Sequence, residues 1–250
     1  YSEDVNAGGF IGRGQASVLI ENSTNAGAIE VANGEAGGFL GQITKANELS
    51  FIEIKDSTNE GTVTGHGGHP YSVSGMIAYA EPDIKINNST NKGEVINDST
   101  YNGLTIGGLV GTSGGSISVC NSNNEGNITR ITGSSSGGST GGILGKRYSG
   151  DNNNNVGKEI IIKDCSNTGK ISGGGHTGGI AGMLLGDIVT VTDCDNIGCD
   201  VSTGEKNDGD LGGIAGVIIG EKINVENCNV TDGKIYSKID GTSISAGGII

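Results

Sequence analysis

The sequence predicts an all-β fold, a right-handed parallel β-helix (β-solenoid) of about seven rungs, each with roughly 34 residues and three short strands. Three observations predict it. A glycine-rich marker recurs along the chain, a second motif recurs between the markers, and apolar residues alternate with period two rather than with the period of a helix. Because the repeats cover residues 1–250, we expect a single repeat domain that is a segment of a longer chain.

The marker is a glycine pair followed by two apolar or small residues and a further glycine. Its copies begin at Gly8, Gly37, Gly107, Gly141, Gly178 and Gly212, with a degraded copy at Ser74 and a further start at Gly247. Subtracting successive start positions gives 29, 37, 33, 34, 37, 34 and 35 residues. A seven-bladed propeller is the alternative architecture, but each of its blades needs about 40 residues and four strands. The shorter repeat favours the solenoid.

Each repeat is expected to contain three strands. The first follows the glycine pair, the second is an alternating segment such as residues 52–55 (IEIK) or 189–192 (VTVT), and the third is a brief Gly-x-Ile/Val segment. An Asn-x-Gly sequence separates the last two, and we expect a tight corner there because Asn and Gly tolerate left-handed backbone angles. The chirality of parallel crossovers predicts a right-handed coil.

The second motif contains one asparagine at an equivalent place in six repeats. Parallel rungs stack about 4.8 Å apart, so equivalent side chains form columns along the axis. Stacked asparagines can hydrogen-bond from rung to rung, as they do in cross-β structures. The sequence therefore predicts a ladder of side-chain amides formed by Asn25, Asn59, Asn91, Asn124, Asn167 and Asn196.

Composition limits the kind of core and the kind of partner. With 49 Gly, three Phe and no Trp, the chain lacks the aromatic residues for a thick core, so we expect a narrow column of stacked Val, Ile and Leu strands. The net charge of −13 argues against nucleic acid and anionic membrane surfaces, whose phosphates are bound by Lys and Arg. No apolar run approaches the ~18 residues that span a bilayer, so we predict no membrane insertion within this segment.

The two motifs together resemble the GLUG repeat. The strongest match covers residues 178–201, in which GGIAG is followed by VTVTDCDNIGCDV, and the resemblance extends over nearly the whole chain. GLUG repeats occur in large secreted or surface-anchored proteins, including adhesin-like proteins and accessory regions of some surface peptidases. The resemblance implies an extracellular or cell-surface location. It brings no catalytic residue with it, because the repeat of that family contains none.

Three of the five cysteines occupy one repeated position. Cys165, Cys194 and Cys228 stand where Ser23, Ser57 and Ser89 stand in earlier repeats, which predicts an inward-facing column that accepts either small side chain. We expect buried thiols there. A Cys165–Cys194 or Cys194–Cys228 disulfide is the alternative, because neighbouring rungs bring Cα atoms within disulfide range.

Possible metal ligands form one column and one short loop. Asp56, Asp164 and Asp193 are equivalent to Asn22, Asn88 and Asn227, and such a column at a turn is expected to cap backbone N–H groups, with Ca²⁺ binding as the alternative. His66 and His69 lie in one loop, whereas His176 lies three rungs away. A polar loop is therefore the favoured interpretation of the histidines, and we predict no cofactor beyond the Ca²⁺ alternative.

Enzyme motifs do not match. Residues 141–147 (GGILGKR) depart from the phosphate-binding loop, which needs Gly at Thr140 and Ser or Thr at Arg147. The insertion at residues 146–158 is interpreted as a solvated Asn-rich loop, with a binding role as the alternative. Sequons would accept N-glycans in a eukaryotic secretory pathway at Asn22, Asn88, Asn97, Asn127 and Asn229.

These observations favour a non-catalytic extracellular scaffold, namely the stalk or binding region of an adhesin that contacts protein or glycan at a surface. The main alternative is a self-associating structural subunit of a filament, appendage or sheath. A third hypothesis is an accessory repeat region of a secreted peptidase or polysaccharide-active enzyme, whose catalytic domain would lie outside these residues.

Overall fold

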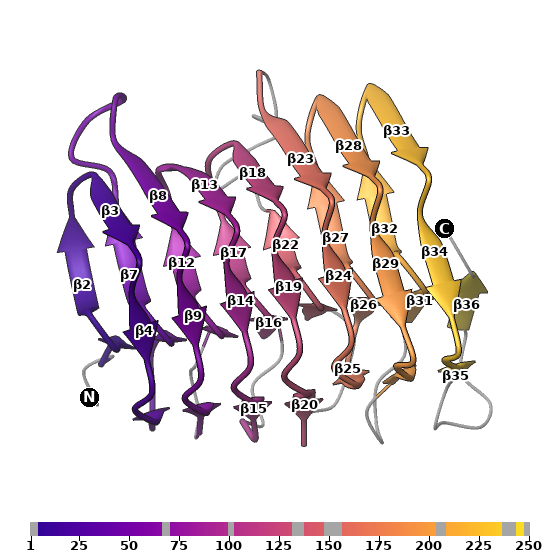
Figure 1. Cartoon of the computed structure of the whole chain (residues 1–250), viewed down its shortest axis with the longest axis horizontal. Helices are drawn as coiled ribbons and strands as arrows, with labels where there is room; N and C mark the ends of the chain where they lie inside the picture. The colour runs from indigo at the N-terminus through magenta and orange to yellow at the C-terminus, as the bar shows by residue number, and fades with distance from the viewer. Residues whose placement is uncertain are drawn as a thin grey trace.

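The computed structural model is an all-β solenoid whose axis runs from left to right in Figure 1. The structure describes residues 5–66, 71–99, 103–131, 138–147, 157–203, 209–236 and 244–247, and none of these residues is helical. In Figure 1 the near strands run downward and those behind run upward while the chain advances to the right, so the coil is right-handed. The predicted fold class is confirmed.

Five parallel sheets run along the axis, named A to E in the order in which each turn visits them. Sheet A contains β1 (Ala7–Gly8), β6 (Ala36–Gly37), β11 (Ser72–Ser74), β16 (Thr105–Gly107), β21 (Ser139–Gly141), β26 (His176–Gly178), β31 (Gly209–Gly212) and β36 (Ile244–Gly247). Sheet B contains β2 (Ile11–Gln15), β7 (Leu40–Thr44), β12 (Ile77–Ala80), β17 (Val110–Ser113), β22 (Leu144–Arg147), β27 (Ala181–Leu185) and β32 (Ala215–Ile219).

Sheet C holds the longest alternating strands: β3 (Val18–Glu21), β8 (Phe51–Lys55), β13 (Asp83–Asn87), β18 (Ile117–Cys120), β23 (Glu159–Lys163), β28 (Ile188–Thr192) and β33 (Lys222–Glu226). Sheet D is made of very short strands: β4 (Thr24–Asn25), β9 (Thr58–Asn59), β14 (Thr90–Asn91), β19 (Asn123–Asn124), β24 (Ser166–Asn167), β29 (Asp195–Ile197) and β34 (Asn229–Thr231). Sheet E completes the turn: β5 (Ile29–Val31), β10 (Val63–Gly65), β15 (Val95–Asn97), β20 (Ile128–Arg130), β25 (Ile171–Gly173), β30 (Val201–Thr203) and β35 (Ile235–Tyr236).

Sheets B to E each have seven strands, so the solenoid has the seven rungs that the repeat predicts. The expectation of three strands per rung was too low. Sheets B, C and E correspond to the three predicted strands, and sheets A and D are additional. Most strands of A and D span only two or three residues, which is too short for an alternating pattern to be visible in the sequence.

The interior is divided into two apolar cores. The larger lies between sheets B and C and contains, among others, Phe39, Ile54, Leu109 and Val191. The smaller lies between sheets A and E and contains Val31, Ala36, Val63, Val73, Val95, Ile106, Ile128 and Ile171. Alternation on sheet C places Ile52 and Ile54 inward and Glu53 outward, as the period-two pattern predicts.

The left-handed corner lies at a different residue from the one expected. In every rung the Asx residue that follows sheet C has positive φ: Asn22 (47°), Asp56 (50°), Asn88 (48°), Asn121 (49°), Asp164 (52°), Asp193 (54°) and Asn227 (53°). Among the six glycines of the Asn-x-Gly sequence, only Gly198 has positive φ (65°). Asn and Asp tolerate this conformation because their short polar side chains bond locally, so the Asx column makes the corner.

Candidate functional site

The asparagine column forms the predicted ladder. At each of its five steps, Nδ2 of one asparagine donates to Oδ1 of the next at 2.7–2.9 Å. The same Nδ2 also donates to the carbonyl of the glycine two residues later, at 2.8–3.0 Å. The six side chains are buried. The ladder ends at Asn196, because Val230 occupies the next rung, and Nδ2 of Asn196 is left without a hydrogen-bond partner.

The two repeated motifs meet across the solenoid, which sequence reasoning missed. A Cβ added to Gly38 would lie 2.6 Å from Cγ of Asn59, and one added to Gly108 would lie 2.5 Å from Cγ of Asn124. In six of the markers the second glycine therefore packs directly against an amide of the ladder. This contact narrows the cross-section between the two cores, and it explains why the glycine pair and the asparagine recur together.

The predicted serine–cysteine column also forms. Ser57 Oγ donates to the carbonyl of Lys55 at 2.7 Å, and Cys194 Sγ makes the equivalent contact with the carbonyl of Thr192 at 3.1 Å. Cys165, Cys194 and Cys228 are buried, and all five cysteines are free thiols. The expectation of buried thiols is confirmed, and the alternative of a disulfide within this column is not realised.

Cys120 is expected to react faster with thiol reagents than the other four cysteines. Burial raises the pKa of Cys199 to about 11 and raises that of Cys228, and hydrogen bonding with Cys165 is the main cause of the raised pKa of Cys194. Because the thiolate is the reactive form, we expect iodoacetamide to label half-buried Cys120 first. Peptide mass spectrometry of the native protein would measure the order. All five sites should label together after denaturation, and simultaneous native labelling would contradict the prediction.

Within the Asx column, side-chain amides hydrogen-bond to carboxylates of the neighbouring rung. Asn88 Nδ2 donates to Asp56 Oδ1 at 2.6 Å, and Asn227 Nδ2 donates to Asp193 Oδ1 at 3.2 Å. Across the described part of the chain, no group of three or more His, Cys, Asp or Glu residues is placed to hold a metal ion. The Ca²⁺ alternative gains no support from this geometry.

His66 bridges three rungs through two carboxylates. Its Nδ1 lies 2.7 Å from Oδ2 of Asp98, and its Nε2 lies 3.1 Å from Oε1 of Glu30. The hydrogen bond with Asp98 is the main cause of the raised pKa of His66. His176 Nδ1 makes a similar pair with Asp210 Oδ2 at 2.9 Å, whereas His69 lies outside the described residues. His66 and His176 thus link neighbouring rungs through contacts with carboxylates.

The His66 bridge should make stability depend on pH. Because the folded-state pKa of His66 is above its unfolded value, the bridge contributes fully below the unfolded pKa of about 6.5 and is lost as pH rises through the folded value. We expect His66→Gln to lower the urea midpoint at about pH 5.5 and to have little effect near pH 9. Equal losses at both pH values would contradict this assignment. An NMR titration of the imidazole would test the pKa directly.

Four of the five sequons are accessible in the folded chain. Asn22, Asn88, Asn127 and Asn229 are exposed. Asn97 is fully buried in sheet E, where its Oδ1 accepts a hydrogen bond from the backbone N–H of Ser99 at 2.9 Å. The prediction of a glycan at Asn97 is therefore wrong for the folded protein, because a sequon pattern does not show on which face of a strand the asparagine lies.

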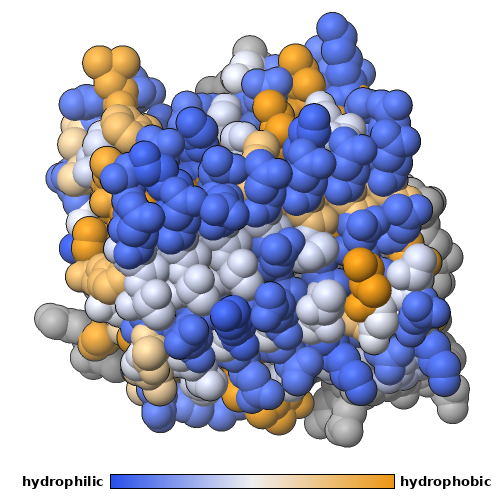
Figure 2. All heavy atoms as spheres, in the orientation of Figure 1, coloured by the Kyte–Doolittle hydropathy of each residue, from blue (hydrophilic) through white to orange (hydrophobic). Residues whose placement is uncertain are grey.

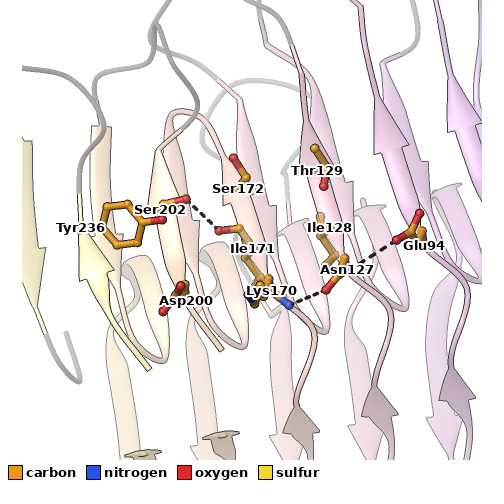
Figure 3. Close-up of a pocket in the computed structure, with 10 residues that line it drawn as sticks. All are labelled: Glu94, Asn127, Ile128, Thr129, Lys170, Ile171, Ser172, Asp200, Ser202 and Tyr236. Carbon is orange, nitrogen blue, oxygen red and sulfur yellow. Dashed lines mark hydrogen bonds between the residues drawn. The ribbon is translucent and has the colours of Figure 1, made fainter. Parts of the chain in front are cut away.

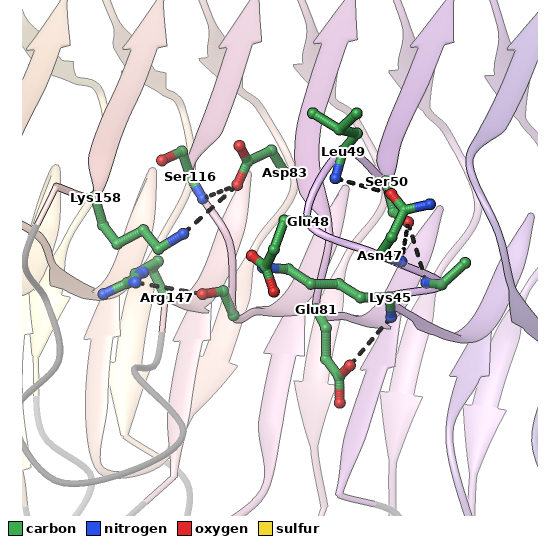
Figure 4. A network of polar contacts seen from close by, with 12 residues as sticks. Lys45, Asn47, Glu48, Leu49, Ser50, Glu81, Asp83, Ser116, Arg147 and Lys158 are labelled. Atoms are coloured by element: carbon green, nitrogen blue, oxygen red, sulfur yellow. Dashed lines mark hydrogen bonds and ion pairs between the residues drawn. The ribbon is translucent and has the colours of Figure 1, made fainter.

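Arg147 hydrogen-bonds to backbone carbonyls at the corner between sheets B and C and does not form part of a phosphate-binding loop. Its side chain is fully buried, and it donates from Nη1 to the carbonyl of Leu185 at 2.7 Å and from Nη2 to that of Gly114 at 3.3 Å. The same corner holds a hydrogen-bonded link between β7 and β8, in which Ser50 Oγ accepts two backbone N–H bonds (Figure 4). Most of the predicted loop at 146–158 lies outside the described residues.

The outer face of sheets C and D is mainly hydrophilic (Figure 2). Ion pairs link neighbouring rungs there, with Lys85 Nζ 3.3 Å from Glu53 Oε1 and Lys55 paired with Glu21. Because both partners of each pair are exposed to solvent, these pairs contribute little to stability.

A trough over sheet E is the main candidate binding site. It has a volume of about 370 Å³ and is lined by Glu94, Asn127, Ile128, Thr129, Lys170, Ile171, Ser172, Asp200, Ser202 and Tyr236. The residues come from several successive rungs, with Glu94 at one end of the trough and Tyr236 at the other (Figure 3). Of the residues predicted from sequence, only Asn127 contributes. Ile128 and Ile171 belong to the core and border the trough from below. The remaining lining residues were missed because their positions carry no repeated pattern.

The fold and its ladders define a parallel β-solenoid repeat protein. Comparisons with protein-family models, with curated proteins and with solved structures find no match. The resemblance to the GLUG repeat therefore rests on the two motifs themselves. Within the described ranges, no helix is long and apolar enough to cross a membrane.

Proposed function

We propose that this chain is a non-catalytic extracellular scaffold that serves as the binding region of a surface adhesin. The observation that carries the proposal is the contrast between the inside and the outside of each rung. Inward-facing positions carry the same residue type from rung to rung, as in the asparagine ladder. Outward-facing positions vary in residue type, and one such column on sheet C consists of Leu19, Glu53, Lys85, Ser118, Ile161, Thr190 and Asn224. Such a scaffold leaves its surface free for recognition.

The rigidity of the scaffold supports a presenting role. The ladder hydrogen-bonds six consecutive rungs, and both apolar cores extend along several rungs. A stacked solenoid of this kind offers an elongated surface without rearrangement on binding. The extracellular location is supported by the resemblance to the GLUG repeat, and the net charge of −13 favours partners that are not polyanions.

Electron microscopy and binding measurements together test the proposal. Negative-stain images of the purified chain over a range of concentrations should show isolated rods, and immobilised extracellular-matrix proteins or glycans should retain the chain in surface plasmon resonance. Ordered filaments or sheets at all concentrations would instead support the structural-subunit alternative. Isolated rods with no retained partner would contradict the adhesin role.

A further inference from the structure

We propose that the trough over sheet E is the binding site for a neutral oligosaccharide. This assignment rests on the proposed binding role of the scaffold and specifies its ligand class. The trough combines an elongated hollow, a lining with four hydroxyl side chains and one side-chain amide, and one aromatic ring at its end. These are the features that a chain of uncharged sugars requires, since each sugar presents several hydroxyl groups and apolar ring faces.

The floor is formed by outward positions of four successive strands. Thr129 on β20 pairs in register with Ser172 on β25, Ser172 with Ser202 on β30, and Ser202 with Tyr236 on β35. The first three positions carry small hydroxyl side chains, which accounts for the hollow. At about 4.8 Å per rung, the three intervals extend roughly 14 Å, enough for a short oligosaccharide lying along the axis.

Hydrogen bonds hold the polar wall in place. Asn127 Oδ1 accepts the backbone N–H of Lys170 at 3.0 Å, and Asn127 Nδ2 donates to Glu94 Oε1 at 3.5 Å. Asp200 Oδ1 accepts the backbone N–H of Lys234 at 3.1 Å. All three bonds cross from rung to rung, and Figure 3 shows the two that Asn127 makes. The donors and acceptors of the wall are therefore ordered before a ligand arrives, which lowers the entropy cost of binding.

Tyr236 supplies a stacking surface at the end of the trough. Its side chain is 38% exposed, and it stands on the outward face of β35 beside Ser202. Ser202 is buried and donates from Oγ to the carbonyl of Ile171 at 3.3 Å. A tyrosine ring offers an apolar face together with a hydroxyl group, so it can cover one face of a sugar ring while half-buried Ser172 and Asp200 bond its edge. The rest of the floor offers no second aromatic ring, which makes Tyr236 the expected anchor.

Charge and sheet pairing select against other ligands. Two carboxylates, Glu94 and Asp200, and one ammonium, Lys170, line the trough of a protein with a net charge of −13. Sulfated or uronic-acid glycans and nucleic acids would therefore be repelled. An extended peptide binds by adding a strand to an open sheet edge, but β20, β25 and β30 are each paired on both sides.

A glycan array followed by calorimetry tests the site. The full chain, produced in bacteria, would be screened against neutral oligosaccharides (cello-, manno-, xylo- and chito-series) and against sulfated and uronic-acid glycans. The best neutral probe should then lose about tenfold or more in affinity with Tyr236→Ala, as anchor residues do, and with Thr129→Tyr, which fills the floor. Matched controls are Phe51→Ala on sheet C and Thr90→Tyr on sheet D, which should bind as the wild type does.

The outcomes separate this site from the proposed function. Neutral-glycan binding that survives both trough variants would overturn the site while leaving the adhesin role in place. Binding only to anionic glycans, or only to matrix proteins, would overturn the ligand class and again leave the adhesin role in place. If no partner of any kind is retained, both proposals fail. Circular dichroism spectra and melting curves of all four variants show whether a loss of binding comes from a loss of folding.

Discussion

Replacing Asn91 with alanine is expected to lower the free energy of unfolding by about 3 kcal/mol or more. The change removes three buried hydrogen bonds: to Asn91 Oδ1 from Asn59, and from Asn91 Nδ2 to Asn124 and to the carbonyl of Gly93. Groups left unpaired in the interior cost about 1–3 kcal/mol each, and no water can replace the partner unless the deletion opens room for one. Urea unfolding followed by far-ultraviolet circular dichroism measures the loss.

A neighbouring asparagine provides the control for this prediction. Asn123 lies on the same sheet but faces outward, where its Oδ1 accepts a hydrogen bond from Ser166 Oγ at 2.8 Å. We expect Asn123→Ala to cost less than about 1 kcal/mol, because water can replace that partner. Equal losses at positions 91 and 123 would mean that the ladder contributes no more than an ordinary surface contact.

Gly108→Ala is expected to destabilise the solenoid by about 3 kcal/mol or more, or to prevent native folding. An added Cβ would lie 1.9 Å from the carbonyl oxygen of Gly142 and 2.5 Å from Cγ of Asn124. Neither group can move freely, because one is backbone and the other is bonded in the ladder. Overpacking at rigid contacts of this kind is among the mechanisms of large mutational losses. Thermal melting and the yield of soluble protein report the effect.

The same substitution at Gly27 is the matched control. Gly27 belongs to the first rung, and the atom nearest to an added Cβ is Asn25 Oδ1 at 3.5 Å, an ordinary contact. Its φ is not positive, so alanine introduces no backbone strain there. Gly27→Ala should melt within a few degrees of the wild type, and a fall as large as that of Gly108→Ala would show that loss of glycine itself, not the clash, is responsible.

The sequence by itself determined the repeat, the fold class and the composition of the inward columns. Period-two alternation in segments such as Ile52–Lys55 identifies a strand and its buried face without any tertiary information. The asparagine ladder and the serine–cysteine column were also predictable, because parallel stacking in register brings equivalent residues together whatever the shape of the turn. The strands of sheets A and D escaped notice because they are too short to alternate.

Only the tertiary structure decided which parts of a rung face each other. Gly108, for example, packs against Asn124 across the solenoid, between the two cores. A one-dimensional pattern does not show such a contact. It also decided that the corner falls at the Asx column, that Asn97 is buried, and that Tyr236 and Thr129 border one trough. The physical reason is that a repeat specifies neighbours along the axis, whereas contacts across the axis depend on the angle of every corner in the turn.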